Sequence, residues 1–498
     1  MYEKICKVRE NPVMQKILSF FDSEWFPVAY AALTLICSFV GFEIVFFALT
    51  AVLIWFITLF GRDSKPLLAI VVLFIYAISQ RHTPQPPYNS DYLYGTPFLA
   101  TVGTLAVITL GVLVFRLVAY PSTGNVFRGR PVARWGLFAL AAALILNGVF
   151  YGEYTFANLL LGVVIAFSFL FFYIYFYHTL EWKDTTAVSV ARILSLACGV
   201  IFLQLVEAYL FDGIIVDGSI AKYNIVLGWG MSNNAGGMLA MFTPALFYLA
   251  YKEKHGWIYY LLGLLSFFGV IMTCSRTSVL AGAVAVLACI VLLAIRGRNV
   301  RAIRIADIVL AVCVIVFCII FRAKILELFQ YYSDRGFDDS GRFEIWLNGM
   351  KRFLQAPIFG VGFYTPIAPD WSYNIENWLL PDMYHNTYVQ LFASCGIVGV
   401  LAYTLHLGQG LVLCFRKFTP ERLFYFIVLL VLTGMSMADN HIFHIFPALV
   451  YSMLFALCEK DYEHKKAQAD SKTAEAECAP QTVSEGSEAE KTQEGEQA

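Results

Sequence analysis

The sequence predicts an all-α polytopic membrane protein from its composition, its repeated apolar segments and the distribution of its positive charges. Hydrophobic residues make up 59% of the 498 residues and charged residues only 14%. Soluble domains contain about 45–50% apolar and about 25% charged residues. This difference excludes an ordinary cytosolic enzyme, a disordered protein and a nucleic-acid-binding protein. The chain has 11 cysteines but no CxxC pair, so we expect buried apolar cysteines rather than a metal or disulfide framework.

Apolar segments recur along the chain, most of them long enough to cross about 30 Å of hydrocarbon as a helix. They predict about 12–14 transmembrane helices. The segments are 25–42, 43–60, 66–80, 97–119, 135–150, 156–177, 188–210, 234–251, 257–274, 277–295, 305–321, 387–414, 423–438 and 441–458.

Lysine and arginine are unevenly divided between the connections that join these segments. One set of alternating short connections carries only Arg81, Lys222 and Arg276. Because positive charge favours the cytoplasmic side, we expect the other set and both termini to be cytoplasmic. That set carries Arg62, Lys65, Arg128, Arg130, Arg134, Lys183, Lys252, Lys254, Arg296, Arg298, Arg301, Arg304, Arg416, Lys417 and Arg422.

The same pattern divides the chain into five regions. Residues 1–24 form a cytoplasmic N-terminal segment, 25–321 the first part of the helix bundle, and 387–458 the C-terminal helices. We expect a disordered acidic cytoplasmic tail at 459–498. Between the two sets of helices, residues 322–386 form one large external loop. A loop of this length is usually functional or a small domain, and it contains the helix-like pieces AKILELFQYY and GRFEIWLNGMKRFLQ.

Three side chains on the external side could carry chemistry. Arg276 lies between two apolar segments, Arg342 lies in the large loop, and His385 lies where the loop re-enters the membrane. Taken singly, Arg276 could be an interfacial arginine that reaches lipid phosphate, Arg342 could pair with Asp338 or Asp339, and a lone histidine is usually structural. Together they indicate a site for a phosphate-bearing substrate, since guanidinium groups bind phosphate bidentately and histidine accepts protons near neutral pH.

The segment from about Gly228 to Val400 resembles the O-antigen ligase and polymerase superfamily of bacterial envelope glycan assembly. The resemblance rests on four motifs in order: GWGMSNNAGGMLAMFTPAL, MTCSRTSVLAG, GRFEIWLNGMKRFLQAPIFGVGF and YHNTYVQLFASCGIVGVL. Relatives often carry an acid just before the glycine of the last motif, whereas Ser394 and Cys395 precede Gly396 here. An acidic role at that place is therefore not expected.

The resemblance implies a membrane glycosyltransferase of the bacterial cytoplasmic (inner) membrane, with a GT-C-like arrangement of its helices. It would transfer or polymerise an undecaprenyl diphosphate-linked glycan onto an acceptor hydroxyl at the outer face, with inversion. Arg276 and Arg342 would hold the diphosphate and His385 would be the general base. The implied partners are the lipid-linked donor, a glycan or glycolipid acceptor, the lipid bilayer and envelope-assembly proteins.

Further residues have more than one interpretation. Asn386 would orient the His385 ring or cap the next helix, and Tyr384, Asn233 and Asn234 would bind sugar or carrier. We expect no metal or other cofactor, because the loop acids form no clear ligand set; these are Asp334, Asp338, Asp339 and Glu344.

Other features of the external side leave alternatives open. Stacking of Trp371, Tyr373 or Trp378 on sugar rings is as compatible with the sequence as simple packing. Asp439, His441 and His444 form a second polar cluster that could line the cavity, but an interfacial turn is the favoured interpretation. The main alternative function is a flippase-type transporter of lipid-linked oligosaccharide or other polysaccharide without catalytic activity, and a non-catalytic scaffold is a further one.

Overall fold

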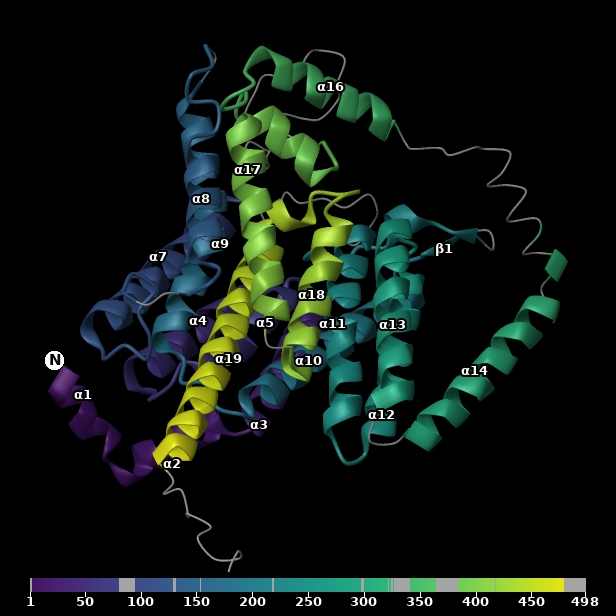
Figure 1. The fold of residues 1–498 in the computed structure, drawn as a ribbon. Helices are drawn as coiled ribbons and strands as arrows, with labels where there is room; N and C mark the ends of the chain where they lie inside the picture. Colours follow the sequence, from purple (N-terminus) through teal and green to yellow (C-terminus); the bar gives the residue numbers. More distant parts are fainter. Residues whose placement is uncertain are drawn as a thin grey trace, which may run out of the picture.

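A computed structural model describes the helical body of the chain (Figure 1). It describes residues 2–79, 95–128, 131–152, 154–216, 219–296, 300–320, 322–323, 326, 341–363, 384–416 and 418–478. The N-terminal helices are α1 (Tyr2–Arg9), α2 (Pro12–Asp22), α3 (Trp25–Val40), α4 (Glu43–Phe60), α5 (Lys65–Leu73), η1 (Phe74–Ala77), α7 (Thr96–Ala119), α8 (Arg134–Ile145), α9 (Phe156–Thr179) and α10 (Thr186–Phe211).

The second half begins with a short antiparallel hairpin of β1 (Ile215–Val216) and β2 (Ser219–Ile220), in which Ile215 pairs with Ile220. Helices follow to the end of the described chain. They are η2 (Lys222–Asn224), α11 (Ser232–Lys252), α12 (Gly256–Met272), α13 (Arg276–Arg296), α14 (Val300–Ile320), α16 (Arg342–Gln355), α17 (Thr387–Phe415), α18 (Pro420–Met435), η3 (His441–Phe443) and α19 (Ile445–Cys478).

Each of the predicted apolar segments coincides with one of these helices, so the chain is an all-α polytopic membrane protein as predicted. In the described part, 6 helices are long and apolar enough to cross a membrane alone. They are α4, α7, α9, α10, α13 and α17. The α2–α3 pair, bent by 71°, would make a seventh. Among the other predicted spans, Lys65–Ala77, α8 and α12 are apolar but shorter.

Helix α11 lies at the centre of the bundle. It packs against α10, α12, α13 and α18, and every residue from Ala235 to Ala250 is buried. A helix that is apolar on all sides belongs in a core, and the small residues of its AGG sequence let the neighbouring helices approach closely. The N-terminal end of α11 is thereby fixed among the ends of its neighbours.

The large loop is joined to the bundle through a break in α17. Gly396 has φ +63°, outside the helical region, and a side chain there would meet the carbonyl oxygen of Ile358. At this break, Val361 N donates to the oxygen of Ala393 (2.8 Å) and Ile397 N donates to that of Pro357 (2.9 Å). The backbone groups released by the break are thus satisfied by the loop. Residues 357–363 are held against α17, directly after α16.

The predicted disordered tail is wrong over its first part, because α19 continues to Cys478. The carboxylate of Glu459 accepts hydrogen bonds from Val132 N (2.7 Å) and Ala133 N (2.9 Å), just before α8. Asp461 pairs with Arg422 at 3.2 Å, and both side chains are buried. These charged residues are therefore bound inside the protein rather than solvated. Residues 479–498 lie outside the described part of the chain.

The helices begin and finish at two opposite ends of the molecule. In Figure 1, α16 and the β-hairpin lie at one end, whereas α2 and the last turns of α19 lie at the other. The starts of α11, α13 and α17 and the α18–α19 connection are at the end that carries α16. The residues proposed from the sequence as a site all belong to this end.

Candidate functional site

The predicted site residues come from connections that meet at the end of the bundle carrying α16. Arg276 is the first residue of α13, Arg342 is the first residue of α16, and His385 immediately precedes the cap of α17. Asn233 lies in the first turn of α11. Asp439, from the connection between α18 and α19, lies among them and links the elements.

The imidazole of His385 is held by Asp439. His385 Nδ1 lies 3.1 Å from Asp439 Oδ1, and the two side chains are 21% and 11% exposed. Burial alone would raise the pKa of Asp439, but the hydrogen bond from His385 and the nearby His441 hold that pKa below its ordinary value. The carboxylate is therefore ionised and orients the ring. With Nδ1–H donated to Asp439, Nε2 carries the lone pair that can accept a proton.

A polar chain runs from Asp439 toward the arginines. Asn233 Nδ2 donates to Asp439 Oδ2 (3.2 Å), and Asn233 Oδ1 accepts from Lys222 Nζ (3.1 Å). The amide of Asn233 therefore bridges a carboxylate and an ammonium group from different elements. This bridge places the Lys222 cation beside the His385–Asp439 pair.

Positive charge is concentrated next to this chain. The pKa of Lys222 is lowered by burial and then by the positive charges of Arg276 and Arg342. Arg342 also helps to lower the pKa of His441, which burial depresses first. Within the described ranges, the side chains of Arg276 and Arg342 form no hydrogen bond or ion pair. Together with Lys222, the two guanidinium groups that lower its pKa form a site suited to a multiply charged anion.

Backbone strain occurs at one of these residues and near another. Among the described residues, the non-glycine positions with positive φ are Cys274 (+54°) and His385 (+50°). Left-handed backbone costs such residues about 1–2 kcal/mol, and strain of this kind concentrates at functional sites. One strained position is His385 itself, and the other lies two residues before Arg276.

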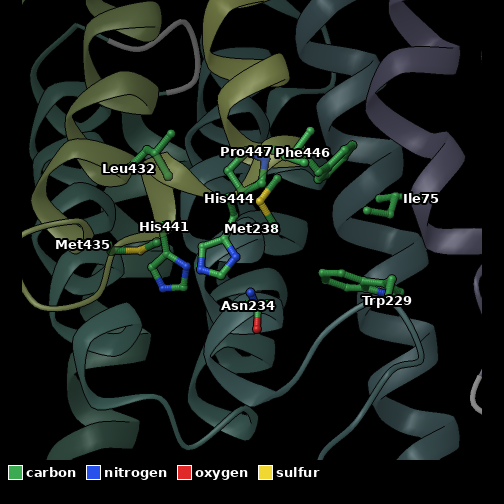
Figure 2. A pocket seen from close by; sticks show the side chains of 12 residues that line it. Ile75, Trp229, Asn234, Met238, Leu432, Met435, His441, His444, Phe446 and Pro447 are labelled. Atoms are coloured by element: carbon green, nitrogen blue, oxygen red, sulfur yellow. The ribbon is translucent and has the colours of Figure 1, made fainter. Parts of the chain in front are cut away.

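The other residues predicted to bind substrate, Asn386, Tyr384 and Asn234, lie outside the polar chain around Asp439. Asn386 caps α17, since its Oδ1 accepts from Tyr388 N (2.9 Å) and Val389 N (3.2 Å); Asp439 rather than Asn386 holds the His385 ring. Tyr384 is buried, with its backbone N donating to Gln390 Oε1 (3.1 Å). Asn234 lines a cavity behind the site, together with His441 and His444 (Figure 2).

Residues 261–404 match the family model of the O-antigen ligase domain. This segment of the chain is therefore similar to the O-antigen ligase family. The resemblance of its sequence to the O-antigen ligase and polymerase superfamily is thus confirmed for this segment, and the match supports an O-antigen ligase- or polymerase-like membrane function. No curated protein matches the chain.

The O-antigen ligase domain contains only part of the candidate site. Arg276, Arg342 and His385 lie within residues 261–404. Asn233 and Lys222 precede this segment, and Asp439 follows it. The family domain therefore supplies the two guanidinium groups and the imidazole, while flanking helices supply the groups that contact the imidazole and add a third cation.

Sequence reasoning left Asp439 and Lys222 out of the site. The sequence favours an interfacial turn for Asp439, yet this residue contacts both His385 and Asn233. The available signal was an acid in an otherwise apolar hairpin on the same side as His385. Six other residues named in the sequence analysis lie outside the described residues; these are Asp334, Asp338, Asp339, Trp371, Tyr373 and Trp378.

Proposed function

We propose that this protein transfers or polymerises a glycan from undecaprenyl diphosphate onto an acceptor hydroxyl. The observation that carries the proposal is the convergence of Arg276, Arg342 and the His385–Asp439 pair at one end of the helix bundle. The match to the O-antigen ligase domain supports the reaction class. A lipid diphosphate and a sugar alcohol are the two reactants that such a set of side chains fits.

The cations act on the leaving group. When the anomeric C–O bond breaks, its electron pair goes to the diphosphate oxygen and negative charge develops there. Arg276 and Arg342 bind the diphosphate oxygens, and Lys222 adds a third positive charge. Preorganised positive groups stabilise the transition state where the charge develops. The positive ends of α13 and α16, at which the two arginines lie, add to this field.

His385 acts on the acceptor. Its Nε2 takes the proton from the acceptor hydroxyl while that oxygen forms the new bond to the anomeric carbon. Asp439 fixes the tautomer and stabilises the imidazolium that results. Attack from the face opposite the diphosphate inverts the anomeric centre. General-base catalysis of this kind contributes about 10²–10⁴ in rate.

The cations of the protein replace a metal ion in this mechanism, so the reaction is independent of divalent metal and needs no cofactor. Asn233 acts by linking Lys222 to Asp439. Asn234 and Tyr384 contact sugar or carrier, and Asn386 positions His385 through the cap of α17.

The reaction takes place at the outer face of the bacterial cytoplasmic (inner) membrane. The scarcity of lysine and arginine in the connections on the site's side supports this orientation. Both termini are then cytoplasmic, and the large loop 322–386 is external. Envelope-assembly proteins supply the donor and receive the product.

The proposal is tested with purified full-length protein, an undecaprenyl diphosphate-linked glycan and a glycolipid acceptor. We expect product in the presence of EDTA. His385→Ala should abolish turnover with donor binding retained, and Arg276→Ala or Arg342→Ala should also weaken donor binding. Activity lost in EDTA and restored by Mg²⁺ or Mn²⁺ would contradict the metal-free mechanism. Translocation of the donor across vesicles without any transfer would instead identify a flippase.

A further inference from the structure

A cavity lies behind the His385–Asp439 pair, between the start of α11, the outer end of α18 and the α18–α19 connection. Its volume is about 170 Å³. Figure 2 shows the rings of His441 and His444 beside the amide of Asn234, with the indole of Trp229 across the cavity. Met238 and Phe446 supply apolar surface. One side of the cavity is therefore polar, and the rest is aromatic or aliphatic.

The polar groups in this cavity are available to a ligand. Neither the side-chain amide of Asn234 nor the imidazole of His444 forms a hydrogen bond to any residue that the structure describes. Burial lowers the pKa of His444 to about 4, with help from the nearby His441. His444 is thus neutral at physiological pH and offers one donor and one acceptor. Unused amide and imidazole groups that line a cavity favour a ligand rich in hydroxyl groups.

Trp229 is fixed in position before any ligand binds. Its Nε1 donates to Gln204 Oε1 (2.9 Å), and its ring packs edge-on against Tyr76 with centroids 4.7 Å apart. Gln204 is itself held, because its Nε2 donates to Ser38 Oγ (2.8 Å) and to the oxygen of Tyr76 (2.6 Å). A rigid aromatic surface loses little entropy on binding, so it is a suitable platform for the apolar face of a sugar ring.

Size limits the ligand further. Pockets for drug-sized molecules measure about 300–1,000 Å³, so a cavity of about 170 Å³ has room for one ring rather than for an oligosaccharide. We infer that this cavity binds a single pyranose ring of the acceptor, with its hydroxyls on Asn234 and His444 and its apolar face on Trp229. This inference rests on the proposed function and names the subsite that orients the attacking sugar.

The location favours the acceptor over the donor. Neither lysine nor arginine lines the cavity, and the diphosphate-binding cations lie elsewhere, around Lys222. The cavity instead adjoins the base: His441 Nε2 lies 3.8 Å from Asp439 Oδ2, whose other oxygen holds His385. A ring bound beside His441 is therefore close to the group that removes the acceptor's proton, and away from the charge on the carrier.

Binding is tested by saturation-transfer NMR on the full-length protein with methyl α-D-glucopyranoside, the galacto and manno isomers, and cyclohexanol as an apolar ring of similar size. We expect at least one glycoside to bind more strongly than cyclohexanol. Asn234→Leu and Trp229→Ala should each weaken that binding about tenfold, the effect of one lost hydrogen bond or stacking contact. Asn224→Leu and Trp257→Ala, which lie outside the cavity, are the matched controls.

Asn234→Ser retains a polar group and should therefore keep part of the affinity. It tests the same contact if the leucine variant does not fold. Equal binding of cyclohexanol and all glycosides, or glycoside binding that Asn234→Leu and Trp229→Ala leave unchanged, would overturn the inference.

Kinetics then separate the two substrates. With the undecaprenyl diphosphate donor, Trp229→Ala should raise KM for the acceptor about tenfold and leave KM for the donor unchanged. A rise confined to the donor would overturn the acceptor assignment. Turnover that requires His385 but is insensitive to both cavity variants would refute the subsite and leave the proposed function standing. Glycoside binding in the cavity without any glycan transfer would refute the proposed function instead.

Discussion

Asp439 holds the ring of His385 at 3.1 Å across 54 residues of sequence, and the contact joins the last hairpin to the start of α17. The strained backbone of His385 is fixed on its C-terminal side by the cap of α17. Its ring is fixed by a carboxylate from another connection. A side chain held from two directions is preorganised for proton transfer, and each of the two restraints can be removed separately.

Asp439→Asn should lower kcat by about 10²–10⁴, the range of a general-base contribution, with donor KM nearly unchanged. The amide keeps the shape but loses the charge that fixes the tautomer of His385 and stabilises its protonated form. Steady-state kinetics provide the measurement, with kcat and the donor KM determined separately. Asp184→Asn, at an exposed carboxylate that pairs with Lys465, is the control. Wild-type kcat in Asp439→Asn would show that the contact is only structural.

Donor binding should depend on the shape of the two arginine side chains as well as on their positive charge. Arg276→Lys and Arg342→Lys retain one positive charge but lose the bidentate fork. We expect each to bind donor more weakly than wild type and more tightly than the alanine variant. Binding of undecaprenyl diphosphate, followed with increasing salt, measures this order. Arg301→Ala, on the exposed side of α14, should bind donor as wild type does. Full activity of Arg342→Ala would remove this residue from the site.

The break in α17 offers a comparison within one helix. Gly396→Ala places a side chain at φ +63° and against the oxygen of Ile358, so it should destabilise the protein by more than about 1–2 kcal/mol. Gly408→Ala points into open space and should be neutral or stabilise by about 0.5–1 kcal/mol. Thermal unfolding in detergent distinguishes the two. Equal melting temperatures of the two variants would mean that the stability of the protein does not depend on the break in α17.

Truncation tests which part of the C-terminal region stability depends on. Removal of residues 479–498 should leave stability and activity unchanged. Removal of all residues after Cys458 deletes Glu459 and Asp461, and leaves Arg422 buried without its carboxylate. Breaking a buried pair costs about 3–5 kcal/mol, so this variant should unfold at a much lower temperature or fail to accumulate. Normal yield and melting temperature would contradict the role assigned to the last turns of α19.

Stability should depend on pH through His444. Because its pKa falls from 6.5 to about 4 on folding, the folded state favours the neutral ring. Its contribution is complete above about pH 6.5 and is lost as the pH falls toward 4. Melting temperatures recorded from pH 7 to 4.5 should therefore decline, and His444→Gln should make the decline shallower. An unchanged slope in this variant would assign the effect to other groups.

Much of the fold was accessible from the sequence, because the hydrocarbon core imposes length and polarity on every helix that crosses it. The predicted segments therefore coincide with helices from α3 to α19, and Arg276, Arg342 and His385 occur together at one end. The tail was mispredicted at Glu459 and Asp461, because charge density alone suggests solvation. Only the fold brings Arg422 and the N–H groups before α8 against these carboxylates.

The contacts of the site residues are also hard to predict from the sequence, because they form only when distant elements pack together. The contact between Asp439 and His385 joins connections that are adjacent only once α17, α18 and α19 have packed. Asn386 has two roles that a sequence cannot separate, and the structure assigns it to the cap. The break at Gly396 is also invisible in hydropathy, since a glycine in an apolar segment is common whether or not the helix continues.

The anchoring of residues 357–363 in the broken helix has a consequence for how such enzymes could diversify. Phe363 N is held by Asn147 Oδ1 (3.0 Å), and Tyr384 N by Gln390 Oε1 (3.1 Å). Both ends of the intervening stretch are therefore fixed to the bundle independently of its own sequence. Evolution could exchange that stretch as a cassette and change the glycans recognised, while the reacting groups on α16 and α17 keep their positions.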